Sequence, residues 1–475
     1  MSKVRNLDNT NLINLGYRIF THQDQFNFAE FSNDFNPIHL DKKYARKTLP
    51  GTAIVHGLHA VLWSIELFLT KFRYIHLEYK VHFHRYIKED SKVNLYWDTK
   101  NNKLIIKNLY DLNLITILCF NKSNNDLNKK AYKIINAPGI QLPEEVNIQK
   151  INTGETFLAL YNGNEDIIKK VFPILSEKLN HEIIKEIALL SFIVGMKIPG
   201  LNSLLVSVNF SISLTDQDQT LLIKSINKDF NFITTEYQGK NVTSTLETFF
   251  RPKPIKPMSC KEIFNLKIIL PNLKNQSVLV VGGSRGLGAI TSKLLACAGA
   301  KVTLSYKYGQ QEAMDVAEDI ISIGKSCKVV QHTVSVSQTY EKFNDKYDQL
   351  YYFPTNKIFY DDGISNNERY NSFHEIYVDC FKNLVENLIK KSKIKKIFYP
   401  STIAIDKPID SLKDYIKAKK EGERICRLLK KKFMIKVLCP RLGRILTDQT
   451  NTMVPVNSDH PVDTMLVFIK LMSSN

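Results

Sequence analysis

The stretch Phe31–Leu69, FSNDFNPIHLDKKYARKTLPGTAIVHGLHAVLWSIELFL, decides how the first part of this chain is read. Asp34 and His39, a carboxylate and an imidazole, stand five residues apart on either side of Asn36-Pro37. Proline fixes its own φ and keeps the preceding residue out of the helical region. We therefore expect a bent loop that turns both side chains toward one point.

A helix is predicted directly after this loop. Apolar residues recur at helical spacing at Val55, Leu58, Val61, Leu62, Ile65 and Phe68, which indicates a buried helix. Its first turn carries free N–H groups and the positive end of the helix dipole, and both suit an oxyanion. Gly57 would let a substrate approach the backbone closely.

A proton-transferring pair beside a helix N-terminus fits one kind of chemistry. Adding or removing water next to a thioester carbonyl needs a base for an acidic proton and an acid for the water. It also needs N–H groups for the developing enolate oxygen.

The motifs SNDFNPIH and IVHGLH resemble those of the MaoC-like, (R)-specific enoyl-CoA hydratases of the hot-dog fold. In that family the Asp and His of D-x-N-P-x-H handle the proton and the water, and the Gly of V-H-G supplies an oxyanion-hole N–H. The resemblance assigns these roles to Asp34, His39 and Gly57. His56 and His59 are interpreted as packing and hydrogen-bonding residues. The alternative is a surface loop with an Asx-turn at Asp34 and a structural histidine.

Length and composition indicate a soluble protein of several domains. With 475 residues the chain exceeds one core, and 44% hydrophobic and 24% charged residues are ordinary values. No apolar run is long enough for a membrane span and the N-terminus lacks a signal-peptide core, so a cytoplasmic location is expected. Seven scattered cysteines without metal-ligand spacing favour a reducing compartment and no metal site.

The net charge of +18 comes from 65 basic and 47 acidic side chains. Local runs of lysine follow two predicted helices, for example at Lys430–Lys432. A solvated face explains such runs, and so does attraction to the phosphates of coenzyme A, a dinucleotide or an acidic acyl carrier protein. No nucleic-acid-binding module is recognisable, so nucleic acid is not an expected partner.

The order of elements predicts a domain and then a degenerate copy of it. A strand at Tyr17–Phe26 precedes the loop, and strands at 74–86, 92–98, 103–109 and 114–121 follow the helix. After a polar linker at Lys122–Lys130, a helix at His181–Met196 is followed by strands at 204–214, 220–227, 232–237 and 242–250, without either motif. The resemblance implies that this second half completes the sheet and helps to shape an acyl-chain tunnel.

The third part contains a Gly-rich turn between a strand and a helix, in SVLVVGGSRGLGAITSKLLACAGAKVTLSY, residues 277–306. A pyrophosphate is expected on the helix N-terminus. The spacing G-x-x-x-G-x-G resembles the short-chain dehydrogenase/reductases. The second strand carries no acid for a ribose 2′-OH, whereas Arg285 and Lys307 suit a 2′-phosphate, so NADP(H) is favoured over NAD(H). The expected cofactor-binding residues are Gly282, Ser284, Arg285, Gly286, Leu287, Gly288, Lys307, Tyr415 and Lys419.

The reductase motif lies further along, where Ser401 follows a buried strand and Tyr415 and Lys419 share a helix face. By the resemblance Tyr415 protonates a carbonyl oxygen, Ser401 holds it, and Lys419 lowers the phenol pKa and holds the nicotinamide ribose. The chain departs from the family in lacking its N-N-A-G turn, where Leu350–Asn356 stands. It also lacks a matching helix Asn near Tyr377, and its Ser–Tyr interval is about one residue longer.

We therefore expect an α+β double hot dog over 1–130 and 131–258, then an α/β Rossmann doubly wound parallel sheet over 259–475. The predicted function combines NADPH-dependent 3-oxoacyl reduction with (R)-3-hydroxyacyl dehydration in acyl-chain synthesis. The substrate would be an acyl-CoA or an acyl carrier protein, and the families' habit of pairing implies a homodimer. The alternatives are a β-oxidation type hydratase with an NAD-dependent dehydrogenase, and a non-catalytic acyl-carrier-binding scaffold.

Overall fold

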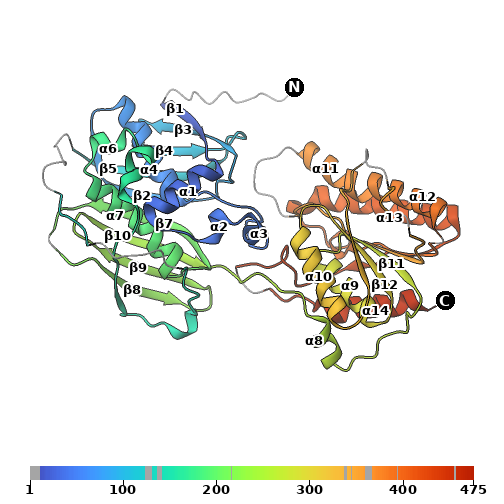
Figure 1. The fold of residues 1–475 in the computed structure, drawn as a ribbon. Coiled ribbons are helices and arrows are strands. Elements are labelled where there is room, and N and C mark those ends of the chain that lie inside the picture. Colours follow the sequence, from blue (N-terminus) through green and yellow to red (C-terminus); the bar gives the residue numbers. More distant parts are fainter. Residues whose placement is uncertain are drawn as a thin grey trace, which may run out of the picture. The chain divides into compact units, whose positions relative to one another are not determined.

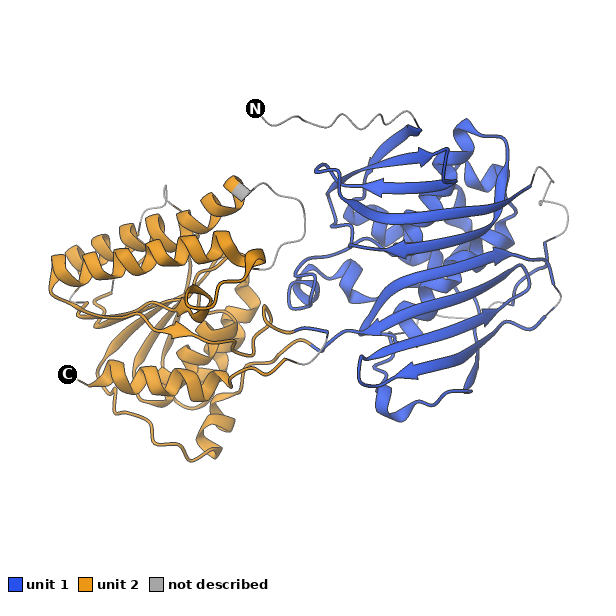
Figure 2. Cartoon of the chain, turned by 180° about the vertical axis from the view of Figure 1, so that it is seen from behind, with its two compact units in different colours: residues 1–253, 452–454 blue, residues 254–451, 455–475 orange. Residues whose placement is uncertain are grey.

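The protein was analysed as a computed structural model that describes residues 11–123, 131–135, 142–215, 217–335, 340–343, 345–358, 366–392, 394–453 and 456–474. It divides into two compact units, residues 1–253 with 452–454 and residues 254–451 with 455–475 (Figure 2). Each unit is treated separately below. The expected boundary between 130 and 131 falls within the first unit.

The first unit is built on one ten-stranded antiparallel sheet. Its first five strands are β1 (Leu12–Ile19), β2 (Ile75–Phe83), β3 (Lys92–Asp98), β4 (Lys103–Lys107) and β5 (Asn113–Ser123). The other five are β6 (Thr156–Leu158), β7 (Ser203–Ile212), β8 (Thr220–Asn227), β9 (Phe232–Gln238) and β10 (Val242–Phe250). The order β1-β3-β4-β5-β2-β7-β10-β9-β8-β6 reads as one five-strand order followed by its mirror image, joined where β2 pairs with β7.

Two long helices pack against each other on one face of this sheet, α4 (Gly57–Lys71) and α7 (His181–Phe192) (Figure 1). The predicted apolar stripe of α4 is buried, and Ala60, Val61 and Leu62 are fully inaccessible. Fully burying such an aliphatic side chain contributes about 1.5–3 kcal/mol. Side chains of both helices and both halves of the sheet join one hydrophobic core, and a smaller cluster around Ile223, Ile233 and Phe250 lies within the second half.

The segment before the motif departs from the prediction. The strand expected at 17–26 ends at Ile19, and helix α1 (His22–Ser32) begins where Thr21 and Asp24 form a capping box. Reciprocal side-chain bonds of this kind satisfy amides that a helix start leaves unpaired. The alternation of apolar residues correctly predicts a strand here, but the capping box at Thr21 starts a helix and so ends the strand at Ile19.

The segment between Asp34 and His39 is also more ordered than a bent loop. Asn36 caps the one-turn helix α2 (Pro37–Leu40), with Pro37 at its first position, and α3 (Lys42–Ala45) follows. Asn at the cap and Pro at the first position are both favoured at helix starts, which explains the difference. His39 therefore lies on a helical turn.

The second half repeats the order of the first around α7. Short helices α5 (Ile168–Val171) and α6 (Leu175–Lys178) precede it, and α7 continues as one π-helical turn over Ile193–Lys197. The predicted strands of this half are confirmed to within about two residues. Of the expected polar linker, residues 122 and 123 belong to β5 and the remainder lies outside the described residues.

The second unit contains a six-stranded parallel sheet. Its strands are β11 (Ser277–Val281), β12 (Lys301–Tyr306), β13 (Cys327–Gln331), β14 (Gln349–Tyr352), β15 (Lys396–Phe398) and β17 (Lys436–Leu438). The order β13-β12-β11-β14-β15-β17 is the doubly wound order 3-2-1-4-5-6. The prediction of a Rossmann sheet is confirmed by this topology.

Helices cover both faces of the parallel sheet, and the central strand shows why. Val278 and Val280 pack with helices α9 (Gly286–Cys297), α10 (Gln310–Ser322) and α14 (Pro461–Ser473), whereas Leu279 and Val281 pack on the opposite side. That side carries α11 (Asn366–His374), α12 (Phe381–Lys391) and α13 (Lys413–Phe433). A strand buried on both faces needs an unbroken apolar run, as this one has.

Smaller elements complete the second unit. Helix α8 (Cys260–Asn265) precedes the sheet, a π-helical turn over Glu375–Cys380 joins α11 to α12, and strands β16 (Ser401–Thr402) and β18 (Arg441–Leu442) pair in parallel. Within the described ranges, none of the helices is both long and apolar enough to span a membrane.

Candidate active sites

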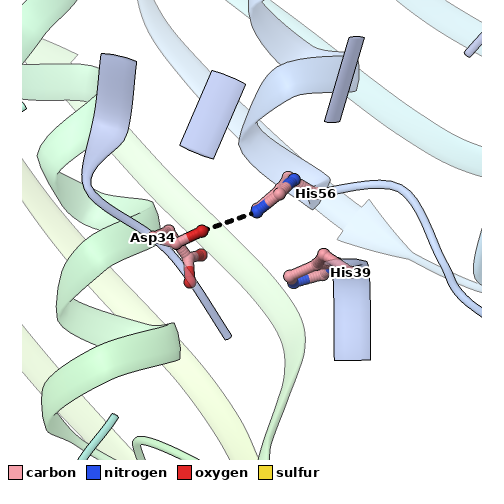
Figure 3. Close-up of side chains that lie close together, drawn as sticks. All are labelled: Asp34, His39 and His56. Carbon is pink, nitrogen blue, oxygen red and sulfur yellow. Dashed lines mark hydrogen bonds between the residues drawn. The ribbon is translucent and has the colours of Figure 1, made fainter. Parts of the chain in front are cut away.

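The motif of the first unit brings Asp34 and His39 together with His56, as Figure 3 shows. One ligand atom from each of the three side chains lies within 4.8 Å of the others. Asp34 lies in the turn after α1, His39 on α2, and His56 immediately before α4. The five-residue spacing and the helix start therefore converge on one point, as the sequence predicts.

The carboxyl group of Asp34 is enclosed by polar contacts. Its Oδ2 accepts a 2.7 Å hydrogen bond from the Ser191 hydroxyl, and its Oδ1 accepts one from the Asn36 amide at 3.2 Å. Burial nevertheless dominates and raises the pKa of Asp34 to about 7, because a buried carboxylate loses its hydration. Near neutral pH this carboxyl is therefore able to hold or to release a proton.

His39 is held in one tautomer. Its Nδ1 donates to the carbonyl oxygen of Ile54 at 2.8 Å, which leaves the lone pair on Nε2. Burial lowers the pKa of His39 to about 4, and the Arg251 guanidinium adds to this effect. His39 is therefore a neutral imidazole with a basic nitrogen at neutral pH.

His56 is a hydrogen-bonding residue, as predicted. Its Nδ1 lies 2.9 Å from Oε1 of Gln25 and its Nε2 lies 3.0 Å from the Asp34 carbonyl oxygen. Its ring stacks on His39 with 3.8 Å between centroids. His59 is a packing residue, stacked on Phe28 at 4.8 Å, and neither of its ring nitrogens has a hydrogen-bond partner within the described part of the chain.

Three such side chains could in principle hold a metal ion. Here both nitrogens of His56 face protein oxygens, Nδ1 of His39 is bonded to Ile54, and both carboxyl oxygens of Asp34 accept hydrogen bonds. Of the ring nitrogens and carboxyl oxygens, only Nε2 of His39 remains open to a ligand. We interpret the cluster as an acid–base group.

Gly57 is the first residue of α4, and no side chain caps this helix. The amides of its first turn have no acceptor within the helix, and the helix begins directly after His56 of the cluster. A Cβ at Gly57 would lie 2.8 Å from the Phe83 ring, which explains why this position requires glycine. The first turn can therefore supply an N–H to an oxyanion.

Residues of the second half reach this cluster, which local sequence patterns do not indicate. The Asn36 side chain donates to the carbonyls of Gly195, Gly200 and Leu201, at 2.8, 3.1 and 3.3 Å. A Cβ at Gly195 would lie 2.2 Å from Oδ1 of Asp34. The π-helical turn thus packs directly on the Asp34 carboxyl, and Ser191 and Arg251 escaped the sequence analysis.

In the second unit, the Gly-rich turn links β11 to α9. Gly282 and Gly286 have positive φ of 78° and 54°, and a Cβ at Gly288 would lie 2.1 Å from the Gly282 oxygen. Arg285 precedes α9 in an extended conformation, and no side chain bonds to the first-turn amides. This cradle fits a pyrophosphate, because only glycine permits the close approach and the helix start offers N–H groups.

The other expected cofactor residues surround this turn. Ser284 and Leu287 flank Arg285 and Gly286 and are partly exposed, and Lys307 lies exposed after β12 with its ammonium 4.8 Å from the Tyr308 ring. Gly282 and Gly283 donate to Ser305 of β12, which fixes the turn against the end of the second strand.

Tyr415 and Lys419 lie on α13 as predicted, and both are buried. The Lys419 ammonium donates to the Pro400 carbonyl at 2.7 Å and lies 5.9 Å from the Tyr415 ring centroid. Burial raises the pKa of Tyr415 to about 12 and lowers that of Lys419 to about 7. The pKa of the phenol is therefore raised and not lowered as expected, because desolvation outweighs the lowering by the hydrogen bond with Thr402.

Ser401 is not the hydroxyl that meets Tyr415. Its Oγ donates to Glu423 at 2.6 Å, in a network with Arg441. The hydroxyl bonded to Tyr415 belongs to Thr402, one residue closer in the chain. The sequence does contain a signal for this difference, because the interval from Ser401 to Tyr415 is about one residue too long. Counting from Thr402 gives the expected interval, so Thr402 takes the position predicted for Ser401.

The missing N-N-A-G turn is replaced by a packed segment. Backbone atoms of Phe353 and Pro354 lie 3.1–3.2 Å from where a Cβ at Gly282 would be. The Thr355 hydroxyl lies 2.5 Å from that of Tyr377, whose ring lies 3.8 Å from the Lys419 ammonium. An aromatic residue of the π-helical turn thus covers Lys419 where the family's helix Asn is missing.

Comparison with known proteins gives two kinds of match. Residues 13–108 match the family model described as MaoC like domain. The resemblance of the first unit is therefore confirmed, and this chain contains a MaoC-like domain of the hot-dog fold.

The curated short-chain dehydrogenase/reductase FrzI of Cladobotryum sp is 41% identical over 61 residues, which are 13% of this chain and 24% of FrzI. The chain thus matches about a quarter of that relative. The match agrees with the resemblance to the short-chain dehydrogenase/reductases that the Gly-rich turn shows.

Solved structures similar to this chain include the angucycline C-6 ketoreductase LanV with bound NADP. It is 19% identical, and the match covers 43% of this chain and 91% of LanV with a TM-score of 0.39. The oxidoreductase yciK of E. coli is 18% identical, and the match covers 42% of this chain and 90% of yciK with a TM-score of 0.38. These values are too low to argue from, and the Rossmann assignment rests on the strand order.

Proposed function

We propose that the first unit is an enoyl-thioester hydratase, acting in reverse as a 3-hydroxyacyl dehydratase. The observation that carries the proposal is the buried meeting of Asp34, partly protonated at neutral pH, with the basic Nε2 of a neutral His39. A carboxyl and an imidazole with pKa values pushed apart are suited to general acid and general base roles.

The resting protonation states suit the addition of water. Nε2 of His39 takes a proton from water as its oxygen bonds to C3, and the carboxyl of Asp34 gives a proton to C2. The first-turn amide of Gly57 donates to the thioester oxygen, where negative charge develops. Dehydration uses the same groups in the opposite protonation states.

We also propose that the mirror-image order of the ten-stranded sheet is a double hot dog. Each half places one long helix, α4 or α7, against five strands, and only the first half carries the motif. The second half would then shape the acyl-chain site beside the α7–π-helix junction.

The hydratase is tested by the loss of enoyl absorbance from crotonyl-CoA on incubation with the full chain. Asp34→Asn keeps the shape of the side chain and removes the acid, so hydration should fall by at least about 100-fold. Unchanged hydration in this variant would refute the assignment. Asp111→Asn, an exposed carboxylate between β4 and β5, is the matched control.

For the second unit we propose reduction of a 3-oxoacyl thioester by a nicotinamide dinucleotide held at the Gly-rich turn. The bound dinucleotide supplies the hydride. Tyr415 gives its proton to the carbonyl oxygen, the Thr402 hydroxyl holds that oxygen, and Lys419 favours proton release from the phenol once charge develops.

NADP(H) is the proposed form of the dinucleotide. Lys307 follows β12 directly, no acid stands at the end of that strand, and Arg285 lies in the turn. A guanidinium and an ammonium suit a 2′-phosphate, whereas an acid would suit a free ribose hydroxyl. Arg285→Ala should weaken NADPH binding about tenfold and leave NADH binding unchanged.

The reductase is tested by absorbance at the reduced-nicotinamide band with an acetoacetyl thioester and either dinucleotide. Oxidation of NADPH that disappears in Tyr415→Phe would support both the activity and the cofactor. Preferred oxidation of the hydroxyacyl thioester with NAD would favour a degradative direction. Failure to bind either dinucleotide would favour a scaffold in the second unit. Acyl carrier, homodimerisation and cytoplasmic location remain predictions.

A further inference from the structure

Two side chains from the half without the motif reach the Asp34–His39 pair. Ser191 lies on α7, and its hydroxyl donates to Oδ2 of Asp34 at 2.7 Å. Arg251 follows β10, at the start of the proline-rich stretch RPKPIKPM (residues 251–258), yet it is only 2% exposed. Both belong to the first unit, so their contacts lie within one compact body.

Arg251 is held rigidly by main-chain carbonyls. Its Nε donates to Ser203 at 2.8 Å and its Nη2 to Leu201 at 2.7 Å, while its own amide donates to Asn202. The Leu201 carbonyl also accepts from the Asn36 side chain, which caps the helical turn carrying His39. Arg251 and the motif therefore share an acceptor.

The charge of this guanidinium is not neutralised. Among the described residues it forms no ion pair, and its Nη1 makes no well-aligned hydrogen bond, although the Tyr44 phenol lies beside it. Burying a cation without an anionic partner is costly. A fold that retains such a charge, bonded to the same carbonyl as the cap of the His39 turn, indicates a use for it at the active site.

We propose that Ser191 and Arg251 are positioning residues of the hydratase, with Ser191 orienting the Asp34 carboxyl and Arg251 supplying a fixed positive charge beside His39. The half without the motif is then part of the active site. This inference rests on the proposed hydratase function and extends it to residues that the MaoC motif does not include.

The two residues act on opposite partners. The Ser191 hydroxyl favours the ionised form of Asp34, so its loss raises the pKa of Asp34 above about 7. Arg251 disfavours a second positive charge, so its loss raises the pKa of His39 above about 4. Hydration needs a protonated Asp34 and a neutral His39. Activity therefore falls at high pH, where Asp34 loses its proton, and at low pH, where His39 gains one. The pKa of Asp34 sets the alkaline limb of the pH profile, and the pKa of His39 sets the acid limb.

The other titratable groups around His39 come from separate elements. Asp34 faces it from the turn after α1, His56 stacks on it from the start of α4, and Arg251 follows β10. Tyr44 of α3 lies beside the guanidinium. These groups are unchanged in the variants below, so a shift of one limb is assigned to the substituted residue.

The test is the pH profile of kcat/KM for crotonyl-CoA hydration by the full chain, from about pH 4 to about pH 9. Ser191→Ala should move the alkaline limb upward and leave the acid limb in place. Arg251→Met should move the acid limb upward by about one pH unit. Arg251→Lys keeps the charge but loses the paired hydrogen bonds to the Ser203 and Leu201 carbonyls. It should therefore lower kcat, while its acid limb should lie closer to that of wild type than the acid limb of Arg251→Met does.

Controls in the same unit are Ser244→Ala, a buried serine on β10, and Arg73→Met, an exposed arginine after α4. Both should leave the profile unchanged. If Arg251→Met does not fold, Arg251→Gln replaces it. Lower activity with both limbs in their wild-type positions would show that the residues are merely structural and would overturn the inference.

A readout independent of activity separates this inference from the proposed function. The titration of His39 is followed by NMR in histidine-labelled protein and assigned with His39→Gln. A wild type that hydrates no enoyl thioester would refute the hydratase. The inference would then stand only if Arg251→Met still raises the pKa of His39, and would fall if that pKa is unchanged.

Discussion

The ammonium nitrogen of Lys419 lies 3.8 Å from the ring centroid of Tyr377, a residue of the π-helical turn before α12. Tyr399 lies on another side at 4.9 Å. Aromatic faces attract a cation, but here the surroundings exclude water, and the net result is a pKa lowered to about 7 by burial. Lys419, the lysine proposed for the reductase site, is therefore poised between its two charge states.

This burial predicts a pH dependence of stability. Between the folded pKa of about 7 and the ordinary value of 10.5, the unfolded chain holds more protons at Lys419 than the folded chain. The free energy of unfolding of the second unit should therefore rise with pH in this window, by at most about 1.4 kcal/mol per pH unit. Lys419→Met should abolish that rise.

Urea unfolding at several pH values, followed by circular dichroism, measures this difference. Both tryptophans, Trp63 and Trp97, lie in the first unit, so their fluorescence reports that unit separately and should not respond to Lys419→Met. A difference between wild type and variant that stays constant with pH would contradict a lowered pKa.

Substitution of Thr402 and Ser401 should separate a catalytic hydroxyl from a structural one. Thr402→Val removes the hydroxyl bonded to Tyr415 and should lower kcat for ketone reduction by about 100-fold. Ser401→Ala removes a bond to Glu423 and should mainly cost about 1 kcal/mol of stability. The comparison uses NADPH oxidation and thermal unfolding, and the reverse pattern would restore Ser401 to the catalytic role.

Gly288→Ala tests the dinucleotide cradle. The new Cβ would lie 2.1 Å from the Gly282 oxygen, so α9 must move away from the turn. We expect NADPH affinity, measured by calorimetry, to fall at least tenfold because the first-turn amides are displaced. Gly324→Ala, in the same unit, adds a Cβ in open space at φ +73°, so it strains the backbone away from the Gly-rich turn and should leave affinity unchanged. Equal affinities in the two variants would argue against this binding site.

Gly195→Ala tests whether the second half shapes the hydratase site. Its Cβ would lie 2.2 Å from Oδ1 of Asp34, so the carboxyl must rotate away from Ser191. Crotonyl-CoA hydration should fall by about 100-fold, whereas NADPH oxidation by the second unit should persist. Gly51→Ala, also in the first unit, adds a Cβ in open space at φ +70°, so it strains the backbone without touching Asp34 and is the control. Retained hydration would show that Asp34 does not need this packing.

Much of both units follows from local patterns in the chain. The spacing of Asp34 and His39, the apolar stripe of α4 and the glycines before α9 each depend on a few neighbouring residues. Their consequences, a helix start beside an acid–base pair and a tight turn at a strand end, follow from backbone sterics and helix periodicity. For the same reason, the capping box at Thr21 could have corrected the strand expected at 17–26.

Only the tertiary structure decided which distant groups complete the sites. Ser191 meets Asp34 across 157 residues, and Arg251 comes from the proline-rich stretch that follows β10. Likewise, whether Ser401 or Thr402 meets Tyr415 depends on how β16 pairs with β18. Periodicity predicts which face of an element is buried, but packing determines which side chain lies opposite. The desolvation that sets the pKa values of Asp34, His39 and Lys419 depends on that packing.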